Sequence, residues 1–129
     1  MKKNILGLDY GKSKVGVAIS EGSFATPLKV VRYEDLDGLL EKIGKIVNGK
    51  RIEKIVVGVS SGKMAEESKE FAKELGYELG IKVEIHDEVL STKMAQKKAI
   101  EAGIRREKRQ KMEDAFAAAL ILENYLENE

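Results

Sequence analysis

The sequence predicts an α/β protein with a five-stranded mixed sheet, an antiparallel meander followed by parallel strands, and helices on both faces. Two apolar stretches near the start of the chain, separated by a short polar loop, predict a β-hairpin. The run "KIVVGVS" at 54–60 is continuously apolar and β-branched, which is typical of a strand buried on both faces. Beyond this run, helical and strand patterns alternate as they do in parallel α/β units. The expected order is β-β-β-α-β-α-β-α-α.

The meander is expected to occupy the first quarter of the chain. Residues 4–9 form an apolar run, and residues 14–20 alternate between branched apolar residues on one face and small residues on the other. A third strand is expected at 28–33. Pro27 would then lie at the entrance of this strand, where a missing N–H does least harm.

The rest of the chain alternates helices with strands. Asp35 is a plausible N-cap for the first helix, because a carboxylate there accepts from free backbone N–H groups. The charged stretch "RREKRQK" at 105–111 is expected to join the last two helices as a loop. Strands are expected at 54–60 and 81–85, and helices at 35–48, 65–79, 91–102 and 111–127.

Length and composition predict one globular domain over 1–129. Apolar residues make up 43% of the chain and charged residues 35%, which is unlike a disordered chain. The formal net charge is +1, so any basic surface must be local. The chain has no cysteine, which excludes disulfides and thiolate metal sites. No apolar run reaches membrane-spanning length and the start is unlike a signal peptide, so we expect a cytoplasmic protein without a membrane partner.

Acidic residues stand where the predicted strands end. Asp9 ends the first strand, and Asp87 and Glu88 follow the fifth. Ligands of such sheets bind beyond the carboxyl ends of parallel strands, so Asp9 and Glu88 would meet if the two strands are near neighbours. Asp114 is expected to open the last helix at the head of a mostly apolar stripe, which directs it toward the sheet.

Clustered carboxylates repel one another unless a cation neutralises them. Oxygen ligands suit Mg²⁺ or Mn²⁺. Two such ions roughly 4 Å apart can clamp the attacking water and the leaving oxygen of a phosphodiester. Glycines at 11 and 16 would let a phosphate backbone approach Asp9 closely.

Each carboxylate also has a plainer interpretation. Asp9 suits a turn, the "HDE" at 86–88 suits a solvated loop, and Asp114 suits the first turn of a helix, where the dipole favours negative charge. Their joint placement favours the metal site over these readings.

Four blocks of the sequence together resemble the YqgF family, also called RuvX, of Holliday junction resolvases and ribosomal RNA-precursor nucleases. They are "GLDYGKSKVGVAIS", "IVVGVSSG", "IHDEVLSTKMA" and "EDAFAAALILENYLE". The resemblance covers nearly the whole chain. It implies a ribonuclease H-like fold and metal-binding catalytic carboxylates at Asp9, Glu88 and Asp114. It also implies processing of the 5′ end of pre-16S ribosomal RNA, or cleavage of branched DNA.

Two positions depart from the family pattern. Val89 stands where the family usually has an arginine after "DE", which removes a phosphate contact. The loop after the fourth strand is the short "SSGKMAEES", and its 60–65 portion lacks the Pro, Asn and Asp common in the family. Both departures bear on how substrate is held.

Basic residues near the predicted carboxylates are candidates for binding phosphates. A solvated charged loop is the alternative for the cluster before Asp114. His86 suits either a proton shuttle or a structural role, and Tyr10 either base stacking or core packing. The candidate nucleic-acid-binding residues are Lys12, Lys14, Arg105, Arg106, Lys108, Arg109 and Lys111.

The leading prediction is therefore a Mg²⁺- or Mn²⁺-dependent nuclease, with pre-ribosomal RNA or branched DNA as its partner. A non-catalytic ribosomal RNA-binding protein that keeps the fold is an alternative. An actin-like nucleotide-binding module is a further one, although such proteins need two domains of this kind. The choice between RNA and DNA, between endonuclease and exonuclease action, and between monomer and homodimer stays open.

Overall fold

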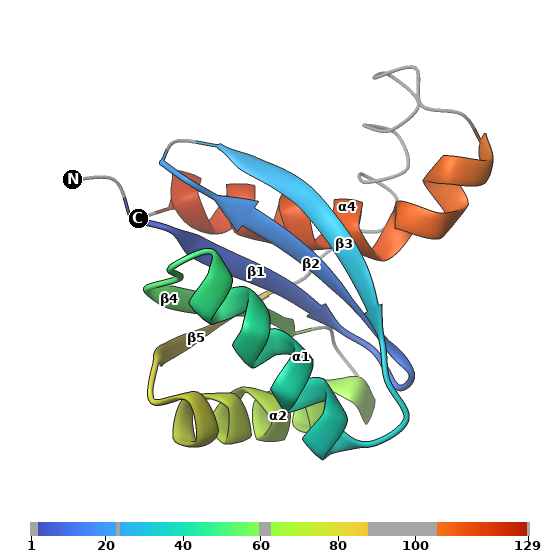
Figure 1. Cartoon of the computed structure of the whole chain (residues 1–129). Helices are drawn as coiled ribbons and strands as arrows, with labels where there is room; N and C mark the ends of the chain where they lie inside the picture. The colour runs from blue at the N-terminus through green and yellow to red at the C-terminus, as the bar shows by residue number, and fades with distance from the viewer. Residues whose placement is uncertain (1–2, 23, 60–62, 88–105, 129) are drawn as a thin grey trace.

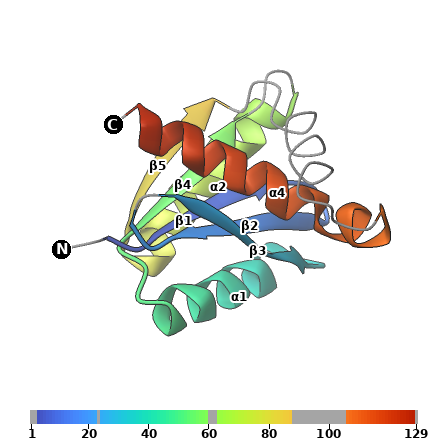
Figure 2. The same cartoon turned by 90° about the horizontal axis from the view of Figure 1, so that it is seen from above.

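The computed structural model describes residues 3–22, 24–59, 63–87 and 106–128 (Figure 1). Within these ranges one five-stranded sheet lies between helices (Figures 1 and 2). The expected helix at 91–102 lies outside the described residues. No helix formed by the described part of the chain is both long and apolar enough to cross a membrane.

The sheet is mixed, as predicted. The strands lie in the order β3-β2-β1-β4-β5. The pairs β1–β2 and β2–β3 are antiparallel, whereas β1–β4 and β4–β5 are parallel. The strand bounds are β1 Ile5–Tyr10, β2 Lys14–Ser20, β3 Ala25–Arg32, β4 Lys54–Val59 and β5 Lys82–Asp87.

Helices cover both faces of the sheet, which confirms the predicted layers (Figures 1 and 2). Helices α1 (Leu36–Gly49) and α2 (Lys63–Leu79) lie on one face, and α4 (Arg106–Glu127) crosses the other in contact with all five strands. Asp35 caps α1 as expected, accepting a hydrogen bond of 2.7 Å from the Gly38 backbone N–H.

Strand alternation divides the core into two layers. On β2, Val15 and Val17 belong to the large cluster that packs against α1 and α2, whereas Ala18 belongs to the smaller cluster under α4. Small residues on the α4 face let that helix lie close to the sheet. A Cβ placed on Gly7 would lie 2.9 Å from the Cβ of Leu122.

Pro27 lies inside β3 rather than at its entrance, so that prediction is wrong. Strand β3 begins at Ala25, and Pro27 pairs with Ala18 beside a register shift between Val17 and Ala18. Proline is tolerated there because β3 is an edge strand and a bulge interrupts the regular ladder.

The prediction of a loop at the basic stretch 105–111 is also wrong for residues 106–111, which are the described part of this stretch. Helix α4 begins at Arg106, five residues before the predicted start. Arginine, lysine, glutamate and glutamine are good helix formers, so a strongly charged run can form part of a helix.

Candidate active site at the carboxyl end of β1

The aspartate of β1 lies between two glycines on neighbouring strands. Asp9 pairs with Gly16 of β2 and with Gly58 of β4. It follows Gly7 by two residues, and alternation along a strand therefore places both on the face covered by α4. Because neither neighbour carries a side chain, α4 can approach the sheet on both sides of Asp9, and the Ile121 side chain lies over Gly58.

Helix α4 crosses the sheet at the level of Asp9. A Cβ placed on Gly16 would lie only 1.8 Å from the backbone oxygen of Asp114 and 2.8 Å from the backbone nitrogen of Ala115. The Asp114 backbone therefore lies directly over Gly16, the residue that pairs with Asp9. The structure brings together two of the three predicted carboxylate positions, which are 105 residues apart in sequence.

Asp114 lies inside α4, not at its start, so its expected position at the head of the helix is wrong. The helix dipole acts mainly within the first turn, so it does not explain a carboxylate eight residues after Arg106. The apolar stripe that follows Asp114 is confirmed, since Ala118, Leu122 and Tyr125 are buried against the sheet. This stripe holds Asp114 at the sheet surface.

Lys14 forms an ion pair with Asp114. Its Nζ lies 3.1 Å from Asp114 Oδ2, and the two side chains are 43% and 28% exposed. Lys14 was predicted to bind phosphate, and the structure adds a contact with a predicted metal ligand. Lys12 is exposed in the preceding turn, and Lys111 is exposed on α4.

The remaining predicted basic residues are described only through the backbone, or not at all. Arg106, Lys108 and Arg109 lie in the first turns of α4. Arg105 lies outside the described residues.

The third predicted carboxylate, Glu88, also lies outside the described residues, as do Val89 and residues 60–62 of the shortened loop. The structure does show that β4 separates β1 from β5. Asp9, Gly58 and His86 stand in one row across these strands, and Asp87 ends β5 one residue later. The ends of β1 and β5, where the acidic residues were predicted, are therefore separated by one strand, β4.

The donor set fits a hard divalent cation. Asp9 and Asp114 supply carboxylate oxygens, the ligand type that Mg²⁺ and Mn²⁺ prefer. Within the described ranges, no three His, Cys, Asp or Glu residues are grouped so that they could hold a metal ion. Two positions therefore fit the predicted metal site, and the third predicted ligand, Glu88, lies outside the described residues.

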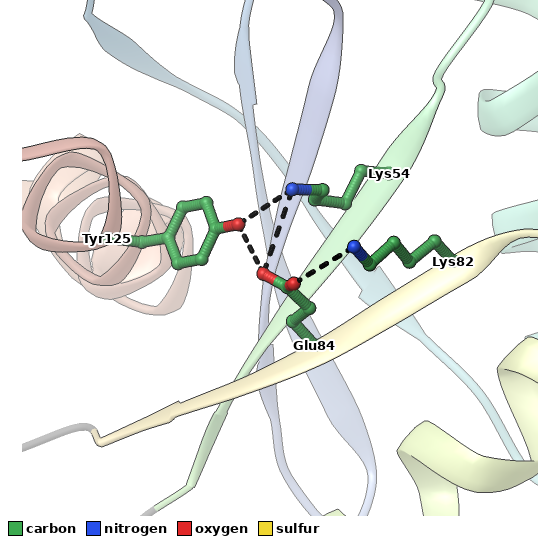
Figure 3. Close-up of polar contacts among 4 residues, drawn as sticks. All are labelled: Lys54, Lys82, Glu84 and Tyr125. Atoms are coloured by element: carbon green, nitrogen blue, oxygen red, sulfur yellow. Dashed lines mark hydrogen bonds and ion pairs between the residues drawn. The ribbon is translucent and has the colours of Figure 1, made fainter. Parts of the chain in front are cut away.

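A partly buried polar network, which the sequence patterns did not predict, ties α4 to β4 and β5 (Figure 3). The Lys54 ammonium group donates a hydrogen bond of 2.8 Å to the Tyr125 hydroxyl, which donates in turn to Glu84. Lys54 and Lys82 lie 3.7 Å and 3.4 Å from Glu84 carboxylate oxygens. The hydrogen bond from Tyr125, with the nearby lysines, lowers the pKa of Glu84. A lysine opening an otherwise apolar strand was the one sequence hint of this network.

His86 is in contact with the same part of α4. Its Nε2 atom lies 2.6 Å from Asn124 Oδ1, and its ring meets that of Tyr125 edge-on at 5.9 Å. These contacts with α4 favour the structural role for His86.

Tyr10 is partly buried and packs against the core. Its ring stacks on Phe71 with centroids 4.3 Å apart and lies 6.4 Å from the ring of Tyr33. The Tyr33 hydroxyl donates a hydrogen bond to the Gly11 carbonyl, and burial is the main cause that raises the pKa of Tyr33. This aromatic cluster holds the turn after Asp9 in place.

The strand order, the α4 crossing and a carboxylate at the end of the central strand define a ribonuclease H-like protein with a candidate nuclease site. The match to a sequence family is equally direct. Residues 3–128 match the family described as "RuvX: Holliday junction resolvase". The chain belongs to this family, whose members are nucleic-acid hydrolases.

Two similar proteins that are named as nucleases match this chain over nearly their whole length. A protein of Lactococcus lactis subsp. lactis named "Putative pre-16S rRNA nuclease" is 37% identical over 137 residues, covering 98% of this chain and 96% of the relative. A protein of the same name from Halothermothrix orenii is 37% identical over 130 residues, covering 95% and 93%.

Solved structures support the fold. The RuvC protein of T. thermophilus in complex with a Holliday junction substrate superposes with a TM-score of 0.65 at 16% identity, covering 98% of this chain and 96% of RuvC. The fowlpox virus resolvase bound to Holliday junction DNA gives a TM-score of 0.63 at 14% identity, covering 97% of both chains.

Proposed function

We propose that residues 1–129 act as one nuclease domain that hydrolyses phosphodiester bonds with the help of Mg²⁺ or Mn²⁺. The observation that carries this proposal is the crossing of α4 over β2, where the Asp114 backbone lies against the glycine that pairs with Asp9. A fold that needed only a packed helix would gain nothing from carboxylates at this crossing, since like charges close together oppose each other.

The three proposed catalytic residues, Asp9, Glu88 and Asp114, would hold the metal. Two bound ions would activate the attacking water and stabilise the leaving oxygen. The glycines beside Asp9 let α4 approach the sheet rather than a phosphate, so the access expected at Gly16 is wrong: the Asp114 backbone and the Ile121 side chain lie where Cβ atoms on Gly16 and Gly58 would be.

The proposed nucleic-acid-binding residues are close in sequence to Asp9 or to Asp114. Lys14 balances the charge of Asp114, and its partly exposed ammonium group would contact a phosphate oxygen of the substrate. Lys12 in the same hairpin and Lys111 on α4 are exposed. Arg105, Arg106, Lys108 and Arg109 would extend this basic surface along the chain before Asp114.

The substrate we propose is the 5′ region of pre-16S ribosomal RNA. This rests on relatives that are more than a third identical over nearly their whole length and carry that name. A ribosomal RNA substrate would place the protein in the cytoplasm.

Branched DNA is the second candidate, supported by the family description and by the resolvases that share the fold. Cutting a junction on opposed strands requires two active sites, so it would require a homodimer. A monomer suffices for trimming RNA.

The test is cleavage of a precursor-RNA stem with overhangs and of a four-way DNA junction, each with Mn²⁺ or with EDTA. The wild type, Asp114→Asn and the control Asp37→Asn on α1 are compared. We expect metal-dependent cleavage by the wild type and the control, and none by Asp114→Asn. If the wild type and both variants bind the RNA tightly but none of them cleaves it, a non-catalytic RNA-binding role is favoured instead.

A further inference from the structure

A groove with a volume of about 700 Å³ lies between the edge strand β3 and helix α1. It is outside the candidate active site described above. Its floor includes Leu28 and Ile46, which pack against the core, and buried Val31. The lining residues are Leu28, Lys29, Val30, Val31, Arg32, Lys42, Lys45, Ile46, Gly49 and Lys50.

The groove concentrates positive charge. Half of the lining residues are lysine or arginine, and no Asp or Glu is among the described residues that line it. The whole chain carries a net charge of only +1, so this is a strong local excess. Lys45 lies 3.7 Å from Glu41, but both side chains are more than 70% exposed and the pair is largely screened by water.

Protection of a free strand edge would explain only part of this charge. Lysines on edge strands discourage pairing with other chains, and Lys29 suits that role. Three of the five cations come from α1 or the residue after it, however: Lys42, Lys45 and Lys50. Helix residues are not needed to blunt a strand edge.

One end of the groove lies at the same end of the sheet as the candidate active site, but on the opposite face, the one that α1 covers (Figure 2). Arg32 of β3 pairs with Lys14 of β2, and Lys14 forms the ion pair with Asp114. At this end Lys42 donates a hydrogen bond of 2.7 Å to the Arg32 carbonyl. The α1 side chains therefore reach across to β3, and a phosphate in the groove would be within reach of cations from both elements.

We propose that this groove binds, through its phosphates, a single-stranded segment of nucleic acid flanking the bond cut at the Asp9–Asp114 site. The proposal rests on the proposed nuclease function and adds a path for the substrate. The described lining has no aromatic side chain on which bases could stack, so binding is through the backbone and tolerates any sequence. An acidic extended peptide would also suit the charge, but the chain belongs to a family of nucleic-acid hydrolases, which favours nucleic acid.

Salt dependence tests the proposal directly. Neutralising a phosphate of single-stranded nucleic acid changes the slope of log K against log salt by about 0.7. Binding would be measured in EDTA, where metal-dependent cutting is prevented, with an RNA stem carrying single-stranded overhangs and with the same stem made blunt. The double variant Lys29→Gln, Lys45→Gln is compared with the control Lys69→Gln, Lys73→Gln on α2, whose residues do not line the groove.

For the overhang RNA, the groove variant should have a slope shallower by about 1.4, two phosphates at 0.7 each, while the control keeps the wild-type slope. The blunt stem should show no such difference. An unchanged slope for the overhang RNA, or an equal change for the blunt stem, would overturn the proposal. So would a groove variant that keeps its RNA slope but loses binding to a peptide of alternating glutamate and valine, which would identify a peptide site.

The two proposals fail separately. A protein that cuts neither substrate but shows the slope change would retain the groove as an RNA-binding site and reject the nuclease. A metal-dependent nuclease whose groove variant binds like the wild type would reject the groove alone.

Discussion

The backbone oxygen of Asp114 lies where a Cβ on Gly16 would be, so helix α4 and strand β2 are in contact without an intervening side chain. Gly16 pairs with Asp9. One glycine thus fixes how closely the helix that carries one proposed catalytic residue approaches the strand that carries another. The contact links packing to function, because any residue larger than glycine must push Asp114 away from Asp9.

Replacing Gly16 with alanine is expected to impair both stability and cleavage. The added methyl group would overlap backbone atoms of α4, and backbone cannot move aside as a flexible side chain can. We expect a loss of about 1–3 kcal/mol in the free energy of unfolding, typical of overpacking, and loss of metal-dependent cleavage. Denaturant titration and cleavage assays measure the two effects. In the control Gly76→Ala on α2, where an added Cβ would make only ordinary van der Waals contacts of 3.6 Å or more, both properties should stay within error or improve slightly. A Gly16→Ala variant as stable as the wild type would contradict this packing.

Lys14→Gln is expected to strengthen metal binding while leaving stability nearly unchanged. The ion pair with Asp114 is half-exposed, so its loss should alter the free energy of unfolding by less than about 1 kcal/mol. The Lys14 ammonium, 3.1 Å from Asp114 Oδ2, repels any cation bound there. Calorimetric titration with Mn²⁺, without nucleic acid, should give a lower dissociation constant for the variant than for the wild type. Lys12→Gln is the control, and equal affinities for all three proteins would remove Asp114 from the proposed metal site.

Tyr125→Phe is expected to destabilise the packing of α4 on β4 and β5. The variant keeps the ring but removes the hydroxyl that accepts from buried Lys54 and donates to Glu84. Leaving a buried donor without one of its acceptors costs about 1–3 kcal/mol. Thermal or denaturant unfolding should show this loss, and Tyr77→Phe, at a tyrosine that is 85% exposed, should not. Equal stability of the two variants would show that the hydroxyl is not needed.

The lowered pKa of Glu84 predicts a specific pH dependence of stability. Because the folded protein favours the ionised form, Glu84 contributes stability above its ordinary pKa of 4.5 and loses that contribution as the pH falls through the lower folded value. Glu84→Gln should therefore be less stable than the wild type at neutral pH, and the difference should shrink on acidification. Urea titrations across the acid range measure this trend. The control Glu127→Gln should follow the wild-type curve, and a difference for Glu84→Gln that stays constant with pH would refute the assignment.

The sheet and its two faces could be predicted because strand patterns report burial directly. Alternation on β2 assigned Val15 and Val17 to one face and Gly16 to the other, and the structure places them so. An acidic residue near the carboxyl end of β1 was likewise predictable, although the strand runs one residue past Asp9, to Tyr10.

Helix boundaries and the polar network around Glu84 were harder to predict. Polarity in 105–111 does not distinguish a loop from the polar start of a helix, and α4 begins at Arg106. The contact of Lys54 with Glu84 and Tyr125 depends on the β4–β5 register and on where α4 crosses, neither of which a local pattern contains.

The central claim is that Asp9 and Asp114 belong to one catalytic centre, and a double-mutant cycle on cleavage tests it most directly. Cleavage of the precursor-RNA stem with Mn²⁺ would be measured for Asp9→Asn, Asp114→Asn and the double variant. Residues that act as a unit are strongly non-additive, so each single variant should lose on the order of 10³-fold in rate and the double variant little more. Losses that multiply in the double variant, or a single variant that cleaves like the wild type, would contradict a shared centre.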